Sequence, residues 1–477
     1  MSTLIKNAEI MTMSPEFGTV KGSIFIENGK IAKIIQNEVP GFHSDEVIDA
    51  QSQLVIPGMT NAHYHSYSNL LKGTENGFPL EIWSLYTVAY GHSLTDEDIY
   101  LSVLLGAAEM IRSGVTGCID HFPHLPRIEA ALKAYDESGM HVSFAPMMHD
   151  VPDHQFLGVP LPDFLIKKLE AKAPISVEKM RDLYEEIILR WHGKNGRIHI
   201  ILGPNAPQRC SREMLALCKD LSVQYDLKVH THLLETKIQE EIGRNTFENG
   251  IIGLLDEVGL LNDKLSVAHA VWLYDREIEL LKERNVAFVH NPASNFILGS
   301  GRAPVSTYVK NHMPVGLGTD SSNCGTSHNQ FETMRLASMM QRMSNPDYTE
   351  WLTNESIFKS ATVTGAQIME YSNKRGKIEV GYDADLVFLN KNTSTWAATN
   401  DAISQLVFHE NGLSIDSVMI KGNWVLRKGK ILSFDEHSVI ARVQQRMKQV
   451  VENTSDALEF AEELKPYFEK FYHDFYK

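Results

Sequence analysis

The sequence has few cysteines, and no two of them are close together in the chain. The four residues, Cys118, Cys210, Cys218 and Cys324, include no C-x-x-C pair. This spacing argues against a disulfide framework and against a zinc site built from thiolates. It fits reduced thiols, so we expect a cytoplasmic protein.

Long apolar runs and an excess of positive charge are also missing. No run approaches the ~18 apolar residues that cross a bilayer, and residues 1–13 show no secretory signal or transit peptide. The 45 Lys and Arg residues against 60 Asp and Glu residues give a formal net charge of −15. Because nucleic acids are bound through phosphate neutralisation by Lys and Arg, we expect no nucleic-acid partner and no membrane association. A small-molecule substrate fits this composition.

Alternating strands and helices fill the middle of the 477-residue chain, which is long enough for two domains. Eight short apolar segments end in polar or histidine-bearing residues, at 53–65, 115–121, 141–146, 198–204, 227–232, 265–269, 286–291 and 314–320. Amphipathic stretches with helical spacing separate most of them. The pattern predicts an α/β fold, a (β/α)8 TIM barrel with its active site at the carboxyl ends of the strands. A doubly wound open sheet also alternates strand and helix, so periodicity alone leaves both open.

The two flanks differ from the middle. Residues 4–48 and 376–434 are rich in short alternating strands and Gly turns, and could form one small β domain. We therefore predict a β-sandwich domain from 1–56 and 376–434, a catalytic barrel at 57–375 and a helical extension at 435–477. The extension carries an aromatic stripe of Phe468, Phe471, Tyr472 and Phe475. The stripe favours packing on its own barrel, and the alternative is a subunit interface in a homodimer or larger homo-oligomer.

Two histidines suggest a metal site at the end of the first barrel strand. In Pro57-Gly-Met-Thr-Asn-Ala-His-Tyr-His65, His63 and His65 are separated by one residue. Strand side chains alternate with period two, so both point to the same side. From there the two imidazoles can bind one cation at about 2.0 to 2.1 Å.

Two further ligands follow other predicted strands. His232 ends the fifth strand and Asp320 ends the eighth. Barrel closure brings Asp320 beside His63 and His65, with His232 facing them across a narrow interior. Three imidazoles and one carboxylate suit Zn²⁺ or Fe²⁺ better than Mg²⁺ or Ca²⁺. We expect one divalent ion per chain, with Zn²⁺ favoured over Fe²⁺.

These motifs resemble the amidohydrolase superfamily, in the subgroup of S-adenosylhomocysteine and methylthioadenosine deaminases, guanine deaminases and triazine hydrolases. The matching segments are Pro57-Gly-x-x-Asn-x-His-x-His65, His232-Leu-Leu-Glu235, Ala268-His269, His290-Asn-Pro-Ala-Ser-Asn295, Gly299-Ser-Gly-Arg-Ala-Pro304, Gly318-Thr-Asp320 and Gly381-Tyr-Asp-Ala-Asp-Leu386. They occur in the family's order over nearly the whole chain. The resemblance implies a distorted (β/α)8 barrel with a composite β-sandwich, and disfavours the open sheet.

The resemblance also implies roles for individual residues. A lysine that ends strand four bridges a second metal in some relatives, and Leu202-Gly-Pro-Asn-Ala-Pro207 has none, so one ion is expected. A bound cation can lower the pKa of water from 15.7 to about 7. Asp320 is then the expected base, His269 matches a histidine that orients the attacking water, and Glu235 matches a glutamate that protonates a ring nitrogen. A surface ion pair for Glu235 and a structural hydrogen bond for His269 are the alternatives.

Other residues are weaker candidates for substrate binding. Trp83 could wall the pocket or pack in the core, and Asn205 lies at the mouth of strand four. His290 and Asn295 match a family signature but could equally shape the loop after strand seven. His121, His124, His149 and His154 fit no metal site by spacing and are interpreted as structural or solvated histidines. Residues 147–197 could form a lid.

The leading hypothesis for the reaction is hydrolytic deamination of an amino-substituted nitrogen heterocycle, with release of ammonia. A rival uses the same chemistry to displace an alkylamine, halide or thiol, or to cleave an amide, carbamate, thiocarbamate or urea. A noncatalytic scaffold is a third possibility, and the complete ligand set with Glu235 and His269 argues against it. Ser321-Ser-Asn-Cys-Gly325 departs from the Ala-Ser-Asn-Asn stretch typical of adenosine-type deaminases, which disfavours a nucleoside substrate.

Overall fold

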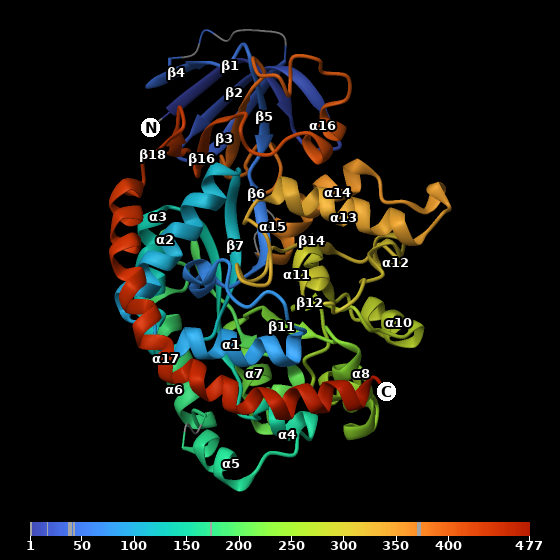
Figure 1. Ribbon diagram of the computed structural model, residues 1–477. Coiled ribbons are helices and arrows are strands. Elements are labelled where there is room, and N and C mark those ends of the chain that lie inside the picture. The colour runs from blue at the N-terminus through green and yellow to red at the C-terminus, as the bar shows by residue number, and fades with distance from the viewer. Residues whose placement is uncertain (1, 17, 37–40, 42, 172–173, 370–373) are drawn as a thin grey trace.

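Helices and strands alternate along most of the chain, as the sequence predicts. The computed structural model describes residues 2–16, 18–36, 41, 43–171, 174–369 and 374–477. Its strands form a mixed sheet at one end of the molecule and two parallel sheets in the middle (Figure 1). The predicted mixed α/β class is therefore confirmed. Within the described ranges, no helix combines the length and apolar character needed to cross a membrane.

The first parallel sheet contains the strand with the paired histidines. Its members are β6 (Met59–Tyr64), β7 (Val115–Phe122), β8 (His141–Met148), β9 (Ile198–Ile200) and β10 (Gly203–Pro204), in the order β10-β8-β7-β6 with β9 also on β8. Every residue of β6, β7 and β8 is buried. Parallel strands covered on both faces show this pattern.

The second parallel sheet follows the order of the sequence. It consists of β11 (Val229–Leu233), β12 (Leu265–His269), β13 (Ala287–His290) and β14 (Val315–Leu317). Bridges between the two sheets exist at both edges, from Tyr64 to Asp320 and from Leu202 to Val229. At the first edge the carbonyl oxygen of His63 accepts the N–H groups of Thr319 and Asp320 at 3.1 and 3.0 Å. These contacts bring the carboxyl ends of β6 and β14 together.

Helices lie between the parallel strands in sequence and also follow the last of them, β14. They are α1 (Leu80–His92), α2 (Asp96–Arg112), α3 (Ile128–Ser138), α4 (Asp153–Leu157), α5 (Asp163–Glu170), α6 (Val177–Trp191), α7 (Arg212–Tyr225), α8 (Lys237–Thr246), α9 (Gly250–Glu257), α10 (Asp275–Glu283), α11 (Pro292–Ile297), α12 (Val305–Lys310), α13 (Gln330–Ser344), α14 (Asn354–Ala361) and α15 (Val363–Met369). The start of α2 is fixed by a capping box, because the Thr95 side chain accepts the N–H of Asp98 and the Asp98 carboxylate accepts that of Thr95.

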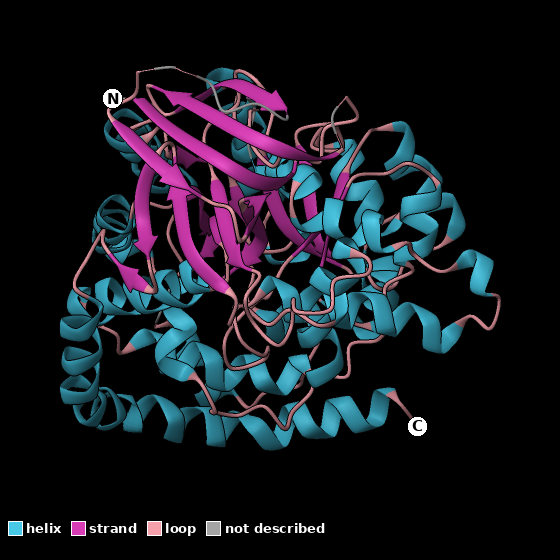
Figure 2. Ribbon diagram, turned by 90° about the horizontal axis from the view of Figure 1, so that it is seen from above, coloured by secondary structure: helices cyan, strands magenta, loops and turns pink. Residues whose placement is uncertain are grey.

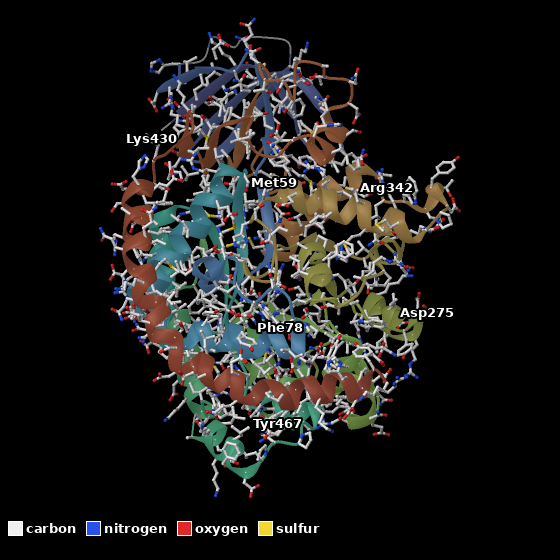
Figure 3. The ribbon with its side chains drawn as sticks, in the orientation of Figure 1. Met59, Phe78, Asp275, Arg342, Lys430 and Tyr467 are labelled. Atoms are coloured by element: carbon white, nitrogen blue, oxygen red, sulfur yellow. The ribbon has the colours of Figure 1, made fainter. Side chains whose placement is uncertain are left out.

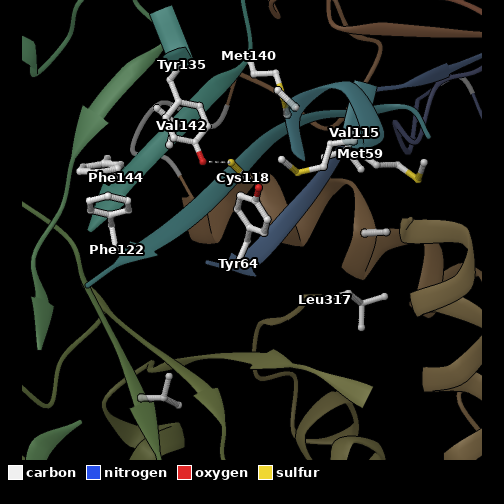
Figure 4. Close-up of a cluster of buried hydrophobic side chains, with 14 of the residues drawn as sticks. Met59, Tyr64, Val115, Cys118, Phe122, Tyr135, Met140, Val142, Phe144 and Leu317 are labelled. Atoms are coloured by element: carbon white, nitrogen blue, oxygen red, sulfur yellow. Dashed lines mark hydrogen bonds between the residues drawn. The ribbon is translucent and has the colours of Figure 1, made fainter. Parts of the chain in front are cut away.

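Aromatic side chains fill the space between the first sheet and its helices (Figure 4). The rings of Phe122 and Phe144 lie 5.0 Å apart. The hydroxyl of Tyr135 on α3 lies 3.7 Å from the Cys118 sulfur on β7. All four cysteines are buried and unpaired, in line with the expected reduced thiols.

The mixed sheet combines strands from both ends of the chain. Its members are β1 (Ser2–Met11), β2 (Thr19–Glu27), β3 (Lys30–Gln36), β4 (Glu46–Asp49), β5 (Gln53–Pro57), β15 (Leu386–Asn390), β16 (Ile415–Ile420), β17 (Asn423–Arg427) and β18 (Lys430–Ile431), with α16 (Ala402–Phe408) between β15 and β16. β5 pairs antiparallel with β15, and from β5 the chain runs directly into β6. Figure 2 shows this sheet from above.

A 40-residue helix, α17 (Glu436–Phe475), ends the chain. It passes α2 and then crosses α1 (Figures 1 and 2). Phe468 is buried in a cluster with Ile82 and Tyr86 of α1, and Phe78 and Tyr467 pack against the same cluster (Figure 3). The aromatic stripe of α17 thus packs on its own chain, which was the favoured expectation. The predicted homo-oligomer and cytoplasmic location stay predictions.

The described part of the segment predicted to form a lid, 147–197, contains three helices. It starts at the end of β8 and includes α4, α5 and α6. Residues 172–173 of this segment lie outside the described residues, as do residues 1, 17, 37–40, 42 and 370–373 of the two predicted domains. Leu157 and Leu165 pack in the same cluster as α1 and α17.

Candidate functional site

The four predicted metal ligands come together at the carboxyl ends of the parallel strands. The Asp320 Oδ1 atom lies 3.2 Å from His65 Nε2 and 3.6 Å from His63 Nε2. His232 Nε2 lies 3.3 Å from His65 Nε2. Two atoms bound at about 2.1 Å to one ion lie about 3.4 Å apart at a tetrahedral angle. The observed separations suit ligands of a shared ion, and the ligand atoms of His63, His65 and Asp320 all lie within 4.8 Å of one another.

A partner outside the cluster holds the Nδ1 atom of each imidazole. These partners are the His230 Nε2 atom, 2.8 Å from His63, the His121 carbonyl oxygen, 2.5 Å from His65, and the Asn205 carbonyl oxygen, 2.5 Å from His232. A carbonyl oxygen can only accept, so Nδ1 of His65 and His232 carries the proton and Nε2 presents its lone pair to the centre. Both rings are therefore oriented for metal binding before an ion arrives.

The donor set also fits a divalent ion electrostatically. His63 Nε2 is buried and has no hydrogen-bond partner among the described residues, so a cation would satisfy it. Burial lowers the pKa of His63 to about 4 and that of His232 well below its usual value, which keeps both rings neutral. Burial alone would raise the pKa of Asp320, but the interactions of its carboxylate with the rings of His63 and His65 outweigh burial and hold this pKa well below its usual value.

Local contacts place Asp320 beside the first strand. The Asn61 side chain on β6 donates to the Thr319 hydroxyl at 2.8 Å and accepts the Thr319 N–H at 3.0 Å. Gly318 comes directly before Thr319 and Asp320. A Cβ atom at position 318 would lie 2.3 Å from Asn291 Oδ1 and 2.7 Å from His63 Cβ. Only glycine allows this close approach. Hydrogen bonding explains Asn61 in the first motif, and close packing explains Gly318 before Asp320.

The two predicted proton-handling residues lie next to the cluster. His269 Nε2 is 3.7 Å from Asp320 Oδ2 and 3.6 Å from Glu235 Oε2. The Asn295 Oδ1 atom lies 2.9 Å from His269 Nδ1, and the Ser300 hydroxyl donates to Glu235 Oε1 at 3.1 Å. Burial is the main reason that the pKa of Glu235 is raised, and the negative charge of Asp320 adds to it. A raised pKa favours the protonated form of the carboxyl group, and that form can donate its proton.

A cavity of about 260 Å³ opens onto this group of residues. Its wall includes Glu235, His269 and Asp320 together with Trp83 of α1 and Asn205 after β10. Trp83 is buried and is one of the residues that line the cavity. Two of the four predicted substrate contacts therefore face the cavity, and aromatic and apolar walls of this kind suit planar ligands.

The other two predicted substrate contacts do not line the cavity. Asn295 is buried and contacts His269, so it can set the orientation of that ring. His290 is also buried, and both of its ring nitrogens have no hydrogen-bond partner in the described part of the chain. Burial lowers the pKa of His290 to about 3, which makes it a neutral ring.

Several residues of the site were not identified from the sequence. His230 supports His63, and its spacing of two from His232 on one strand was the available signal. His121 is fully buried and lies with His63 and His232 in a group whose ligand atoms are within 4.8 Å of one another. His124 and His149 line the cavity. These positions depend on where β7 and β8 end, which spacing along the chain does not show.

Histidines and a carboxylate at the carboxyl ends of parallel α/β strands, beside a cavity, define the class of metal-assisted hydrolases. A model of the Amidohydrolase family matches residues 54–425. The chain belongs to the amidohydrolase family, and it is a hydrolase that acts on C–N bonds.

Relatives with named activities cover nearly the whole chain. The sequence is 35% identical over 442 residues to a 5-methylthioadenosine/S-adenosylhomocysteine deaminase from Pyrococcus furiosus, which covers 92% of this chain and 98% of the relative. It is 30% identical over 456 residues to a 5′-deoxyadenosine deaminase from Methanobrevibacter smithii, with 94% and 98% coverage. The fold matches an adenosine deaminase from Xanthomonas campestris with bound zinc at a TM-score of 0.84 and 23% identity, over 94% and 98% of the chains.

Proposed function

We propose that the chain is an aminohydrolase that removes the exocyclic amino group of an adenine-type nucleoside and releases ammonia. The observation that carries this proposal is that His63, His65, His232 and Asp320 lie close together, and that all of them except His63 line the cavity with Glu235. The named activities of relatives at 30 to 35% identity support an adenine-type substrate. They outweigh the departure at Ser321-Ser-Asn-Cys-Gly325, from which the sequence disfavoured a nucleoside.

The fold proposal is a distorted (β/α)8 barrel with a composite β domain. Bridges at both edges of the two parallel sheets support a closed barrel, and the pairing of β5 with β15 supports a β domain drawn from both chain ends. The proposed division is 1–56 with 376–434, 57–375 and 435–477. In this arrangement the site lies at the carboxyl ends of the barrel strands.

One divalent ion per chain is the proposed cofactor, held by His63, His65, His232 and Asp320. Three imidazoles and one carboxylate favour Zn²⁺, with Fe²⁺ as the alternative, and the zinc in the related adenosine deaminase structure supports Zn²⁺. When bound, such an ion supplies a Lewis acid that lowers the pKa of water to about 7.

The residues around the ion site divide the proton transfers between them. Asp320 is ionised, and its Oδ2 atom faces His269, so Asp320 is the proposed base that takes a proton from water and passes it to the amino group, which leaves as ammonia. His269 orients that water, because its Nδ1 atom is held by Asn295 and its Nε2 atom faces Asp320. Both roles require that the side chain lies within hydrogen-bond reach of the water.

Glu235 is the proposed acid for the heterocycle. Its carboxyl group is buried and lines the cavity, and Ser300 fixes its Oε1 atom. A proton delivered to a ring nitrogen makes the carbon that bears the amino group more electrophilic. Trp83 and Asn205 are the proposed substrate contacts, and Asn295 and His290 are proposed to act behind the site.

A substrate panel tests the proposed reaction. Zinc-loaded protein is incubated with adenosine, 5′-deoxyadenosine, guanine, an amino-triazine, a carbamate and a urea, while ammonia and substrate loss are measured together. We expect equal ammonia and substrate loss with the adenine nucleosides. Turnover without ammonia, or turnover of the carbamate or urea alone, would contradict the proposal.

A further inference from the structure

A second polar group lines the cavity apart from the ion site. It consists of Arg209 in the 3-10 helix η3 (Pro207–Arg209), Asp153 at the start of α4, and Asn205. Arg209 forms a two-pronged ion pair with Asp153, with Nε 2.5 Å from Oδ1 and Nη2 2.8 Å from Oδ2. Its Nη1 atom donates to Asn205 Oδ1 at 2.9 Å. This geometry fixes the plane of the guanidinium.

Arg209 has hydrogen-bonding capacity left over. A guanidinium has five N–H groups, and acceptors within the described residues engage three of them. The side chain is partly buried and lines the cavity. The remaining donors lie on Nη1 and Nη2, the outer end of the group. A ligand atom that accepts hydrogen bonds would complete this arrangement.

The charges around Arg209 favour an uncharged ligand atom. Asp153 neutralises the guanidinium, and Glu235 and Asp320 line the same cavity. His149 and His124 also line it, and burial lowers the pKa of both rings, that of His124 to about 3, so neither adds positive charge. An anionic substituent at Arg209 would lie beside the Asp153 carboxylate, which repels it.

The backbone holds this group in place. The carbonyl oxygen of Arg209 accepts the N–H groups of Asp150 and Val151, both at 3.1 Å. Asp153 follows two residues later, so the segment that carries it is tied to Arg209 by main-chain and side-chain contacts. Asn205, which receives the Nη1 bond, also holds the ring of His232 through its carbonyl oxygen. The group therefore has a fixed position relative to the ion site.

We propose that Arg209 is a specificity-determining residue that binds an uncharged oxygen of the substituent on the heterocycle, such as a sugar hydroxyl, and that Asp153 excludes anionic substituents. This inference rests on the proposed function, since it assigns a contact to the substituent of the same substrate, away from the amino group that reacts. It predicts a preference for neutral nucleosides over their 5′-phosphates.

Changing the charge of Asp153 tests the inference. The quantity measured is the ratio of kcat/KM for adenosine 5′-monophosphate to kcat/KM for adenosine, in zinc-loaded protein. We expect Asp153→Asn to raise this ratio at least about 10-fold, because Arg209 then pairs with the phosphate. Asp153→Glu should keep the ratio low. Asp163→Asn, at an exposed site on α5, removes the same charge away from the cavity and should leave it unchanged.

Arg209 is tested in the same assay. Arg209→Met should lower kcat/KM for adenosine roughly 10- to 100-fold, as expected for a lost hydrogen bond to a charged donor, and Arg209→Met with Asp153→Asn should abolish the gain for the phosphate. An unchanged ratio in Asp153→Asn, or a gain that persists without Arg209, would overturn the inference. If Asp153→Asn does not fold by circular dichroism, Asp153→Ser takes its place. Wild-type protein that deaminates no adenine nucleoside would instead refute the proposed function.

Discussion

The ion site and the α1 wall of the same cavity are built in different ways. In the ion site, strand ends supply the side chains, and a main-chain carbonyl or a second histidine holds each imidazole. In the wall, Leu80, Trp83 and Thr87 come from α1, which packs against α17 from the far end of the sequence. The chemistry thus depends on short-range backbone geometry, whereas the cavity shape depends on long-range side-chain packing.

Backbone conformation reinforces this contrast. His269 and Asp320 have φ values of 72° and 63°, and Leu234, beside Glu235, has 44°. Non-glycine residues rarely adopt this left-handed region, and such positions persist only where surrounding contacts enforce them. None of the residues named for the α1 wall is among those with positive φ. The ion site is therefore the more strained of the two regions.

Replacing Glu235 should have the largest effect on turnover, and this effect should arise in the ion-site region and not in the α1 wall. Glu235→Gln removes the proposed acid while keeping its size, so we expect kcat to fall roughly 10²- to 10⁴-fold with zinc content unchanged. Steady-state kinetics and metal analysis check this. Glu241→Gln, on the solvent side of α8, is the matched control. Near-normal turnover in Glu235→Gln would remove this residue from the acid role.

Truncating Phe468 tests whether the packing of α17 on α1 supports the α1 wall of the cavity. Phe468 is buried between α17 and α1, so Phe468→Ala should lower the free energy of unfolding by about 3 to 5 kcal/mol. We also expect KM to rise several-fold, because α1 loses packing, while zinc content stays the same. Val451→Ala, an exposed position of α17, should change stability by less than about 0.5 kcal/mol. An unchanged KM would show that α17 stabilises the protein without shaping the cavity.

Glu81 lies where the α1 wall meets the ion-site region, and the pH dependence of stability tests its role there. It belongs to α1, and its Oε1 atom accepts the Thr236 hydroxyl beside Glu235 at 2.6 Å. Burial, with a smaller contribution from Glu235, raises its pKa to about 7 from the usual 4.5. The folded protein therefore binds a proton there that the unfolded chain releases between these pH values. Stability must then fall as pH rises from about 4.5 to 7.

Glu81→Gln should remove this pH dependence. The variant keeps the acceptor for Thr236 and has no proton to lose, so its free energy of unfolding should exceed that of wild type by up to about 3 kcal/mol at pH 8 and match it near pH 4.5. Denaturant unfolding at several pH values measures the difference. Parallel pH profiles for the two proteins would mean that Glu81 is ionised in the folded state.

Removing the support of one ligand should have the smallest effect. His230→Gln disturbs the contact to His63 Nδ1 without touching the ion, and contacts of this kind change metal affinity roughly 10- to 100-fold. Zinc competition with a chelator measures the affinity. His437→Gln, an exposed change in α17, is the control. Wild-type affinity in His230→Gln would show that His63 is oriented by the strand alone.

Much of the ion site could be predicted because its rules are local. Period two places His63 and His65 on one side, and strand ends place His232 and Asp320 near them. His230 follows the same rule but supports His63 across the interior, a contact that spacing cannot reveal. The docking of α17 on α1 was one of two expectations, because an amphipathic stripe shows that a face is buried and not what covers it. The positions of Arg209 and Asp153 depend on loops whose paths the sequence leaves open.

The pairing of β5 with β15 has a consequence for how the chain is made. β5 ends at Pro57, and its partner begins only at Leu386. At synthesis rates of about 5 to 20 residues per second, the first strand waits roughly a quarter of a minute to a minute for its neighbour. During that time its edge is open to pairing with other nascent chains. Ribosome-associated chaperones that shield the N-terminal strands should therefore raise the yield of native protein more than those that act after release.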